Sequence, residues 1–377
     1  MENQYLIMYN ETLFYDLVLS FAKGIGPVNT RKLLSYFGSS KELCIAKNNK
    51  LRQLGVSKKL ISSLKLPDNL RKAEKEMKYL ESRKIMAVRY TDEVFPNRLK
   101  NCHDAPFLLF CKRKLNLNNK KILSIVGTRN MTLSGKHFLM NLIKELKKYN
   151  PVIISGLAYG VDICAHREAI KNDLSTIGIL AHGFDRIYPK NHYDTALEML
   201  NKGDLYTEFT SGNKPEKANF IKRNRIIAGL SEATLVVESA EKGGSLITAD
   251  MAFSYDREVF AVPGRPKDIQ SVGCNKLITD NKAALLSNAE DLAFSLGWEP
   301  EVDQIQTLND REPYLMDADE KRIYSVLLRS ERMDTEDLSI ESGLDIKKVL
   351  AKLLQMELKG FVLCHPGKVF EAVGRIN

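Results

Sequence analysis

The sequence predicts an α/β protein built around a parallel sheet with helices on both faces, preceded by a helical domain and followed by a winged helix. Between residues 121 and 287, short runs rich in β-branched residues break into glycine-containing turns, and helical patterns follow. Such repeats are typical of a parallel sheet. Right-handed crossovers bring the loops after the strands to one edge, where such folds bind ligands. The runs are KILSIVGTRN, PVIISGLAYG, STIGILAHG, ATLVVES and REVFAVPG.

Length and composition set the broad class. A chain of 377 residues is long for one core, so two or three domains are expected. The absence of a leader pattern and of a long apolar run predicts a cytoplasmic protein without a membrane partner. The six cysteines form no CxxC pair and no zinc-like spacing, so we expect reduced thiols. We also expect no metal and no cofactor. The net charge of +9 permits a polyanionic partner without requiring one.

Residues 1–84 are expected to form a small helical domain. The turn GIGP at residues 24–27 separates two apolar-periodic segments. Its backbone N–H groups could hold a phosphate, and Thr30, Arg31 and Lys32 lie at the start of the second helix. This is typical of a helix-hairpin-helix or sterile-alpha-motif-like module, although a purely structural pair of helices fits the same pattern.

The large domain is expected over residues 85–298. Its first part, residues 85–114, carries two short strand-like pieces around Pro96 and Pro106, which we expect to flank or extend the main sheet.

The first turn of interest follows KILSIV and contains Gly127, Thr128 and Arg129. Glycine lets the backbone approach a ligand, the following helix offers free N–H groups, and arginine adds a cation. Together they predict an anion site. The pattern is neither GxGxxG nor a P-loop, so neither a dinucleotide fingerprint nor a nucleotide-triphosphate loop is indicated.

Two further turns are expected at the same edge of the sheet. One follows PVII, and the other follows ATLVVES. Asp162 and His166 lie four residues apart in the helix after the first of these turns, and a structural hydrogen-bonded pair is favoured there over a catalytic one. Convergence of several turns is a stronger indication of a site than any single turn. The two turns contain Ser155 and Gly156, and Gly243, Gly244 and Ser245.

The most basic segment is NKPEKANFIKRNRIIAG, residues 213–229. Phosphates require cations and unpaired bases stack on flat apolar groups, so this mixture suits a single strand better than a duplex. A solvated basic loop with its aromatic residue in the core is the alternative. The residues concerned are Lys214, Lys217, Phe220, Lys222, Arg223, Asn224 and Arg225.

These motifs together resemble one family. VGTRN, ISGLAYGVDICAH, GFDRIYPKNH, FIKRNRIIAGLSEATLVVESAEKGGSLITADMA, VFAVPG and SVGCNKLI occur in this order over about residues 95–290. They are similar to the DNA-processing protein A family (DprA, also called Smf). The resemblance implies an extended Rossmann-like domain that dimerises, binds single-stranded DNA and loads the recombinase RecA during natural transformation, with no established catalytic reaction. Single-strand binding protein is a further candidate partner.

The resemblance also implies roles for individual residues. Gly127, Thr128 and Arg129 match the loop that lines the family's DNA pocket. Lys217 and Phe220 stand where the family has a phosphate-contacting lysine and a base-stacking aromatic, and residues 223–225 match its Arg-Asn-Arg. Ile221 and Lys222 stand where the family commonly has Pro-Arg or Pro-Lys, so Ile221 departs from the pattern while the basic residue is kept.

The C-terminal part has a different character. Residues 299–315 predict a linker because they are polar and contain two prolines, and residues 316–377 predict three helices followed by a β-hairpin, a winged helix. Asp334 and Asp345 are expected as N-caps. The expected recognition helix carries only Lys347, Lys348 and Lys352 as cations, so a protein-contacting or dispensable role is favoured over specific DNA reading.

Two other classes of function compete with a single-strand-binding mediator. A Rossmann-like phosphoribohydrolase binds phosphate at similar turns, but the PGGxGTxxE motif is not matched after the strand ATLVVES. Ser155, Asp162, His166 and Glu238 are the residues from which a hydrolytic cluster could be assembled. The other alternative is a regulator that binds duplex DNA through the winged helix. We expect the protein not to be an enzyme.

Overall fold

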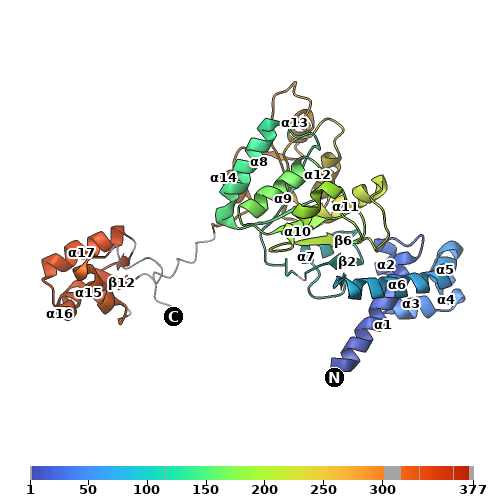
Figure 1. The fold of residues 1–377 in the computed structure, drawn as a ribbon, viewed down its shortest axis with the longest axis horizontal. Coiled ribbons are helices and arrows are strands. Elements are labelled where there is room, and N and C mark those ends of the chain that lie inside the picture. The colour runs from blue at the N-terminus through green and yellow to red at the C-terminus, as the bar shows by residue number, and fades with distance from the viewer. Residues whose placement is uncertain (1, 114, 301–315, 331, 360, 373–377) are drawn as a thin grey trace. The chain divides into compact units, whose positions relative to one another are not determined.

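The structure, a computed structural model, describes residues 2–113, 115–300, 316–330, 332–359 and 361–372. The chain divides into two compact units, Met1–Pro300 and Glu301–Asn377 (Figure 1). Most of the predicted linker, residues 301–315, lies outside the described residues. No helix among the described residues is long and apolar enough to cross a bilayer.

A nine-stranded sheet forms the centre of the first unit. Its order is β1-β2-β6-β5-β4-β3-β7-β8-β9, and the strands from β3 onward in the chain run parallel. β1 and β2 extend the sheet by antiparallel pairing. The strands are Met86–Arg89 (β1), Leu108–Cys111 (β2), Ile122–Val126 (β3), Val152–Ser155 (β4), Thr176–Ile179 (β5), Asp204–Thr207 (β6), Ala233–Val236 (β7), Glu258–Ala261 (β8) and Ala284–Leu285 (β9).

The predicted parallel sheet is confirmed, and the five predicted strands are β3, β4, β5, β7 and β8. β6 was not predicted because it begins with Asp204, a residue that strands disfavour. The buried carboxylate of Asp204 accepts the backbone N–H groups of Lys112 at 3.1 Å and Arg113 at 2.8 Å, which joins β2 to β6. Burial raises the pKa of Asp204 to about 7.

Helices cover both faces of the sheet (Figure 1). α8, α9 and α14 pack on one apolar cluster that contains Ile125 and Ile153, and α11, α12 and α13 pack on another that contains Val126 and Ile154. Successive strand residues therefore point to opposite layers. The helices are Asn97–Lys100 (α7), Leu133–Leu146 (α8), Val161–Lys171 (α9), Tyr193–Met199 (α10), Lys217–Leu230 (α11), Gly244–Ser254 (α12), Val272–Thr279 (α13) and Ala289–Ser295 (α14).

The N-terminal helices pack against the β1-β2 end of the sheet. Leu17, Ala73 and Leu80 share an apolar cluster with Leu108 and Phe110 of β2. The predicted turn at residues 24–27 lies between the first two helices, and Gly24 has a φ of 90° that a side chain would strain. The helices are Glu2–Phe21 (α1), Pro27–Phe37 (α2), Ser40–Ile45 (α3), Asn48–Gln53 (α4), Lys58–Leu64 (α5) and Pro67–Ser82 (α6).

The second unit is the predicted winged helix, and its described residues form three helices and a small sheet in the order β10-β12-β11. Both predicted N-caps are confirmed: the Asp334 carboxylate accepts the N–H groups of Glu336 and Asp337, and the Asp345 carboxylate accepts that of Lys347. The elements are Ala318–Leu327 (α15), Met333–Asp334 (β10), Thr335–Ser342 (α16), Ile346–Leu358 (α17), Val362–His365 (β11) and Val369–Ala372 (β12).

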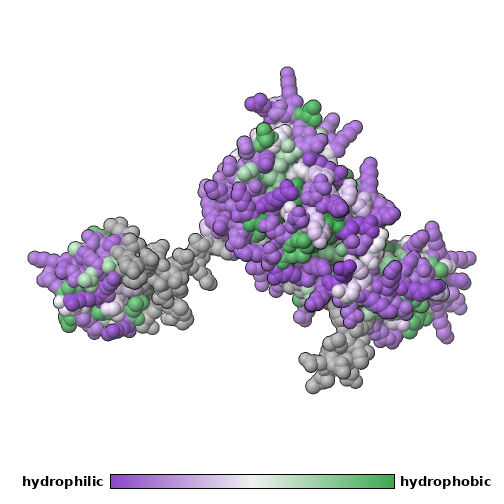
Figure 2. Space-filling view, viewed as in Figure 1, coloured by the Kyte–Doolittle hydropathy of each residue, from purple (hydrophilic) through white to green (hydrophobic). Residues whose placement is uncertain are grey.

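The face drawn in Figure 2 is mainly hydrophilic, with separate apolar patches. All six cysteines are free thiols, as predicted. Among the described residues, no group of three or more histidine, cysteine and acidic side chains could hold a metal ion.

Candidate nucleic-acid interface

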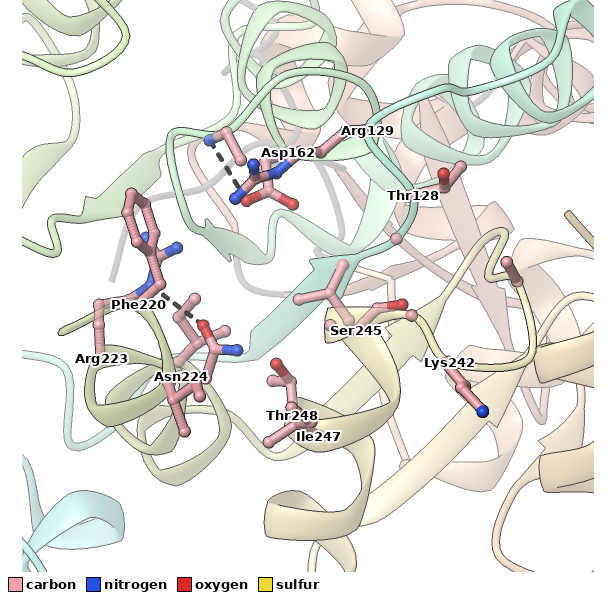
Figure 3. A pocket seen from close by; sticks show the side chains of 18 of the residues that line it. Thr128, Arg129, Asp162, Phe220, Arg223, Asn224, Lys242, Ser245, Ile247 and Thr248 are labelled. Atoms are coloured by element: carbon pink, nitrogen blue, oxygen red, sulfur yellow. Dashed lines mark hydrogen bonds between the residues drawn. The ribbon is translucent and has the colours of Figure 1, made fainter. Parts of the chain in front are cut away.

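The strand order creates a crevice between β3 and β7. From β3 the chain adds β4, β5 and β6 on one side, and it then returns to add β7, β8 and β9 on the other side. The loops after β3 and β7 therefore lead away to opposite sides of the sheet. Open α/β sheets bind ligands at the point between two such loops. A cavity of about 720 Å³ lies there, and we call it the switch-point cavity (Figure 3). Ten predicted site residues line it: Gly127, Thr128, Arg129, Lys217, Phe220, Arg223, Asn224, Gly243, Gly244 and Ser245.

The loop after β3 is packed so closely that only glycine fits at its start. A Cβ at Gly127 would lie 2.5 Å from Cγ2 of Val161. The backbone N–H of Thr128 donates to the carbonyl of Glu238 at 2.8 Å, which joins this loop to the one after β7. The loop is therefore fixed, while the Arg129 side chain beyond it is exposed.

Glu238 supports this arrangement through its side chain as well. Its carboxylate accepts the backbone N–H of Thr132 at 2.9 Å and the Thr132 hydroxyl at 2.5 Å. Thr132 caps α8 by accepting the N–H of Gly135 at 3.1 Å. Glu238, considered in the sequence for a hydrolytic cluster, thus holds the start of α8.

The basic segment forms one wall of the cavity, and it does so as a helix and not as the solvated loop of the alternative interpretation. α11 starts after Glu216, and Lys217, Phe220, Ile221 and Asn224 recur at the spacing of one helical face. Figure 3 shows Phe220, Arg223 and Asn224 along this wall, with Thr128 and Arg129 across the cavity.

The Phe220 ring is surrounded by cations. Cζ of Arg129 lies 5.6 Å from the ring centroid and Cζ of Arg223 lies 5.8 Å from it. The ring of Tyr188 approaches edge-on, with centroids 6.0 Å apart. Both guanidinium groups are within cation–π range, so the site combines a flat apolar surface with positive charge.

Arg223 and Asp162 lie below this surface and are buried. Arg223 donates to the carbonyl of Ile179 and, at 3.2 Å, to Oδ1 of Asn224. Burial lowers the pKa of Arg223 to about 10, so it stays charged at neutral pH, and burial raises the pKa of Asp162 against the opposing effect of Arg223. A Cβ at Gly156 would lie 2.4 Å from Oδ2 of Asp162, so Gly156 makes room for these charges.

The third wall is the N-terminal end of α12. The helix begins after Gly243 without a side-chain cap, so N–H groups of its first turn are available to an anion. Nothing lies within 4 Å of a Cβ built at Gly244, which leaves space for a ligand there. The Ser245 hydroxyl instead donates to Oγ of Ser239 at 2.9 Å.

Four predicted site residues lie outside the switch-point cavity: Ser155, Gly156, Lys222 and Arg225. The Ser155 hydroxyl is buried and donates to the carbonyl of Ile125 at 2.5 Å. Arg225 is buried, forms an ion pair with Glu208 and donates to the carbonyl of Asp104 at 2.6 Å. Lys222 is exposed and lines another cavity with Arg225.

Asp162 and His166 are not joined to each other by any hydrogen bond that the described residues show. The ring of His166 bonds to the Thr176 hydroxyl at 2.7 Å and to the carbonyl of Gly156 at 3.3 Å. Burial lowers the pKa of His166 to about 4. The predicted hydrogen-bonded pair is therefore wrong: each residue is buried and held by its own partners, which is a structural arrangement of two separate residues.

Sequence reasoning missed several residues that line the cavity. Thr248 and Ile247 extend the α12 wall, and Lys242 lies in the turn before it. Thr248 lies three residues after Ser245, so helical periodicity from the predicted turn could have found it. Ile247 and Ile221, 38% and 41% exposed, add apolar surface that a count of charges and glycines cannot reveal.

Comparison with known families gives matches over both units. The family described as DNA recombination-mediator protein A matches residues 86–297, and the DprA winged helix domain matches residues 309–368. Two similar proteins are DNA processing protein DprA of Bacillus subtilis and protein Smf of Synechocystis. The first is 43% identical over 209 residues, 55% of this chain and 70% of its own length. The second is 29% identical over 398 residues, 97% of this chain and 100% of its own length.

Among the solved structures that resemble the chain are two DNA processing proteins. DNA processing protein A from Streptococcus pneumoniae has a TM-score of 0.60 and 28% identity, covering 76% of this chain and 98% of its own. The protein of that name from Helicobacter pylori, whose structure concerns its single-stranded DNA binding mode, has a TM-score of 0.52 and 28% identity, covering 57% of this chain and 98% of its own.

Proposed function

The chain belongs to the DNA recombination-mediator protein A family, and from this premise we propose that it binds single-stranded DNA in the switch-point cavity and mediates recombination. The observation that carries the proposal is the composition of that cavity. A phenylalanine ring, exposed cations and an uncapped helix N-terminus face one space. Stacking surfaces and cations are what a single strand requires.

The geometry favours an unpaired strand over a duplex. Phe220 is only partly exposed and lies within a cavity and not on a flat surface. A base reaches its ring only if it leaves the duplex stack, while Arg129 and Lys217 at the rim contact phosphates. Buried Arg223, whose Cζ lies 5.8 Å from the ring centroid, supports the ring from the interior side.

Fluorescence anisotropy with labelled single and double strands across a salt series tests this proposal. We expect preference for the single strand and a log–log salt slope of about −0.7 for each phosphate neutralised. Arg129→Ala should reduce affinity and flatten that slope. Arg71→Ala, which removes an exposed arginine on α6, provides the charge-matched control. Equal binding of both forms of DNA, or equal effects of the two variants, would contradict the proposal.

The mediator role extends the proposal to protein partners. We infer that the chain delivers RecA onto single strands during uptake of transforming DNA, in the cytoplasm, and that it acts where single-strand binding protein is present. The family's description as a recombination mediator supports this. RecA filament formation on coated single strands, followed with and without the protein, measures it directly, and an unchanged lag would count against it.

A homodimer through the Rossmann-like domain belongs to the same proposal. Phe294 on α14 is 90% exposed, the highest value among the large apolar side chains that the structure describes. Burying such a ring in a second copy removes apolar surface from water. Light scattering of the wild type and of Phe294→Ser tests this, and an unchanged mass would argue against Phe294 as part of the interface.

A further inference from the structure

A second cavity lies on the other side of α11. It has a volume of about 600 Å³ and is bounded by α11, the loop after β6 and the turn at residues 24–27. We call it the hairpin cavity. Its lining includes Gly26, Pro27, Glu208, Phe209, Lys222 and Met251. Nothing in the proposed function of the switch-point cavity uses these residues.

The two cavities share part of a wall. Ile221 lines both of them and is 41% exposed. Lys217, Phe220 and Asn224 face the switch-point cavity, whereas Asn219, Lys222 and Arg225 face the hairpin cavity. A strand that leaves the first cavity over Ile221 therefore reaches the second by crossing a single helix.

Groups that suit phosphate lie at the hairpin cavity. Lys222 is exposed, and no hydrogen bond or ion pair of its side chain occurs among the described residues. α2 begins at Pro27 after Gly26 and has no side-chain cap. Because Thr30 donates its N–H to Gly26 and proline has none, the first turn leaves the N–H groups of Val28 and Asn29 without helical partners.

An incompletely bonded carboxylate lies in the same lining. One oxygen of Glu208 pairs with Arg225, but Oε1 is buried and has no hydrogen-bond partner among the described residues. A buried acceptor without a donor is costly, so a ligand that carries an N–H group would satisfy it. Nucleobases carry such groups on their edges. Phe209 and Met251 add apolar surface beside this acceptor.

The turn is held firmly against the sheet domain. Arg31 donates to the carbonyls of Cys102 and His103, and its Cζ lies 4.9 Å from the centroid of the Tyr90 ring. Arg31, which was expected to assist phosphate binding, instead attaches helix α2 to the sheet domain. Glu76 of α6 accepts the N–H of Ser211 at 2.8 Å, in the loop after β6. The cavity is therefore formed before any ligand arrives.

We propose that the hairpin cavity is a second nucleotide-binding subsite, which receives the continuation of the single strand bound in the switch-point cavity. A phosphate contacts Lys222 and the start of α2, and a base enters beside Glu208, Phe209 and Met251. This subsite rests on the proposed function, because the first cavity must hold the strand. In this subsite the phosphate-binding pattern of the turn at residues 24–27 has a role, whereas the turn does not line the switch-point cavity.

Strand length separates the two subsites. Oligonucleotides of about six nucleotides should fill the switch-point cavity alone, and those of about fifteen should reach both. Lys222→Ala should then flatten the salt slope by about 0.7 for the long strand and leave the short one unchanged. Lys144→Ala, which removes an exposed lysine of α8, is the control. An equal effect of Lys222→Ala on both lengths would overturn the subsite as a continuation.

Photocrosslinking locates the base. Wild-type protein irradiated with a long strand containing 5-iodouracil at successive positions should give adducts on Phe209 or Met251 from one end of the strand and on Phe220 from the other. Short strands should yield the Phe220 adduct alone. Adducts confined to the switch-point cavity at every length would refute the subsite while leaving the proposed function intact. Failure of short strands to bind at all would instead refute the proposed function.

Discussion

The switch-point cavity and helix α17 both carry cations, but two of the three lysines of α17 are paired, whereas the exposed cations of the cavity are not paired within the part of the chain that the structure describes. Arg129 and Lys217 form no ion pair among the described residues, whereas Lys348 and Lys352 pair with Asp319 and Asp317, each at 2.6 Å. α17 also exposes apolar residues along one side: Ile346, Leu350 and Leu354. The difference shows that the number of basic residues is a poor guide to a DNA site, and that unpaired cations beside a concave apolar surface are a better one.

The largest expected effect concerns the buried charges that support the cavity. Arg223→Met leaves Asp162 buried without its nearest cation and the carbonyl of Ile179 without this donor. We expect a loss of about 3 kcal/mol in the free energy of unfolding, measured by urea denaturation. Arg129→Met, at an exposed position, should cost less than about 0.5 kcal/mol. Similar losses of unfolding free energy for both variants would contradict the assignment of Arg223 to support of the fold and of Arg129 to ligand binding.

Phe220 tests the apolar half of the cavity. Phe220→Ala should weaken single-strand binding by about 1–3 kcal/mol, because a base loses its stacking partner. The salt slope should stay unchanged, since no phosphate contact is removed. Ile340→Ala, which removes an exposed apolar side chain from the winged helix, is the control. A change in salt slope without loss of affinity would show that Phe220 acts only by positioning Arg129.

Acid should act on the sheet domain through His166. Its pKa is lowered to about 4 from 6.5, so the folded state takes up a proton later than the unfolded state as pH falls. Its contribution is complete above pH 6.5 and is lost between about 6.5 and 4. Relative to His166→Asn, the wild type should lose about 2 kcal/mol of unfolding free energy by pH 5. Asp16 and Asp204, whose pKa values are raised to about 6 and about 7, titrate in the opposite sense, and their contributions cancel in this difference. A constant difference across this range would contradict the prediction.

The sequence predicted the sheet well because glycine turns mark the ends of its strands. It missed β6, whose position depends on Asp204 bonding to a segment about 90 residues earlier in the chain, a contact that no local pattern contains. The division of the basic segment between two cavities depends on helix geometry. Arg223 and Arg225 are two residues apart and so point about 200° apart around α11. Arg223 supports Phe220, and Arg225 pairs with Glu208. Their closeness in the sequence does not predict these different roles.

The most direct test compares both regions on one single strand. Anisotropy titrations at the same salt concentration would use the wild type, Arg129→Ala, and a triple variant with Lys347, Lys348 and Lys352 changed to alanine. We expect about a tenfold or greater loss for Arg129→Ala, equivalent to about 1.4 kcal/mol or more, and little change for the triple variant, although it removes three charges and not one. A greater loss in the triple variant would contradict this account and assign DNA binding to the winged helix.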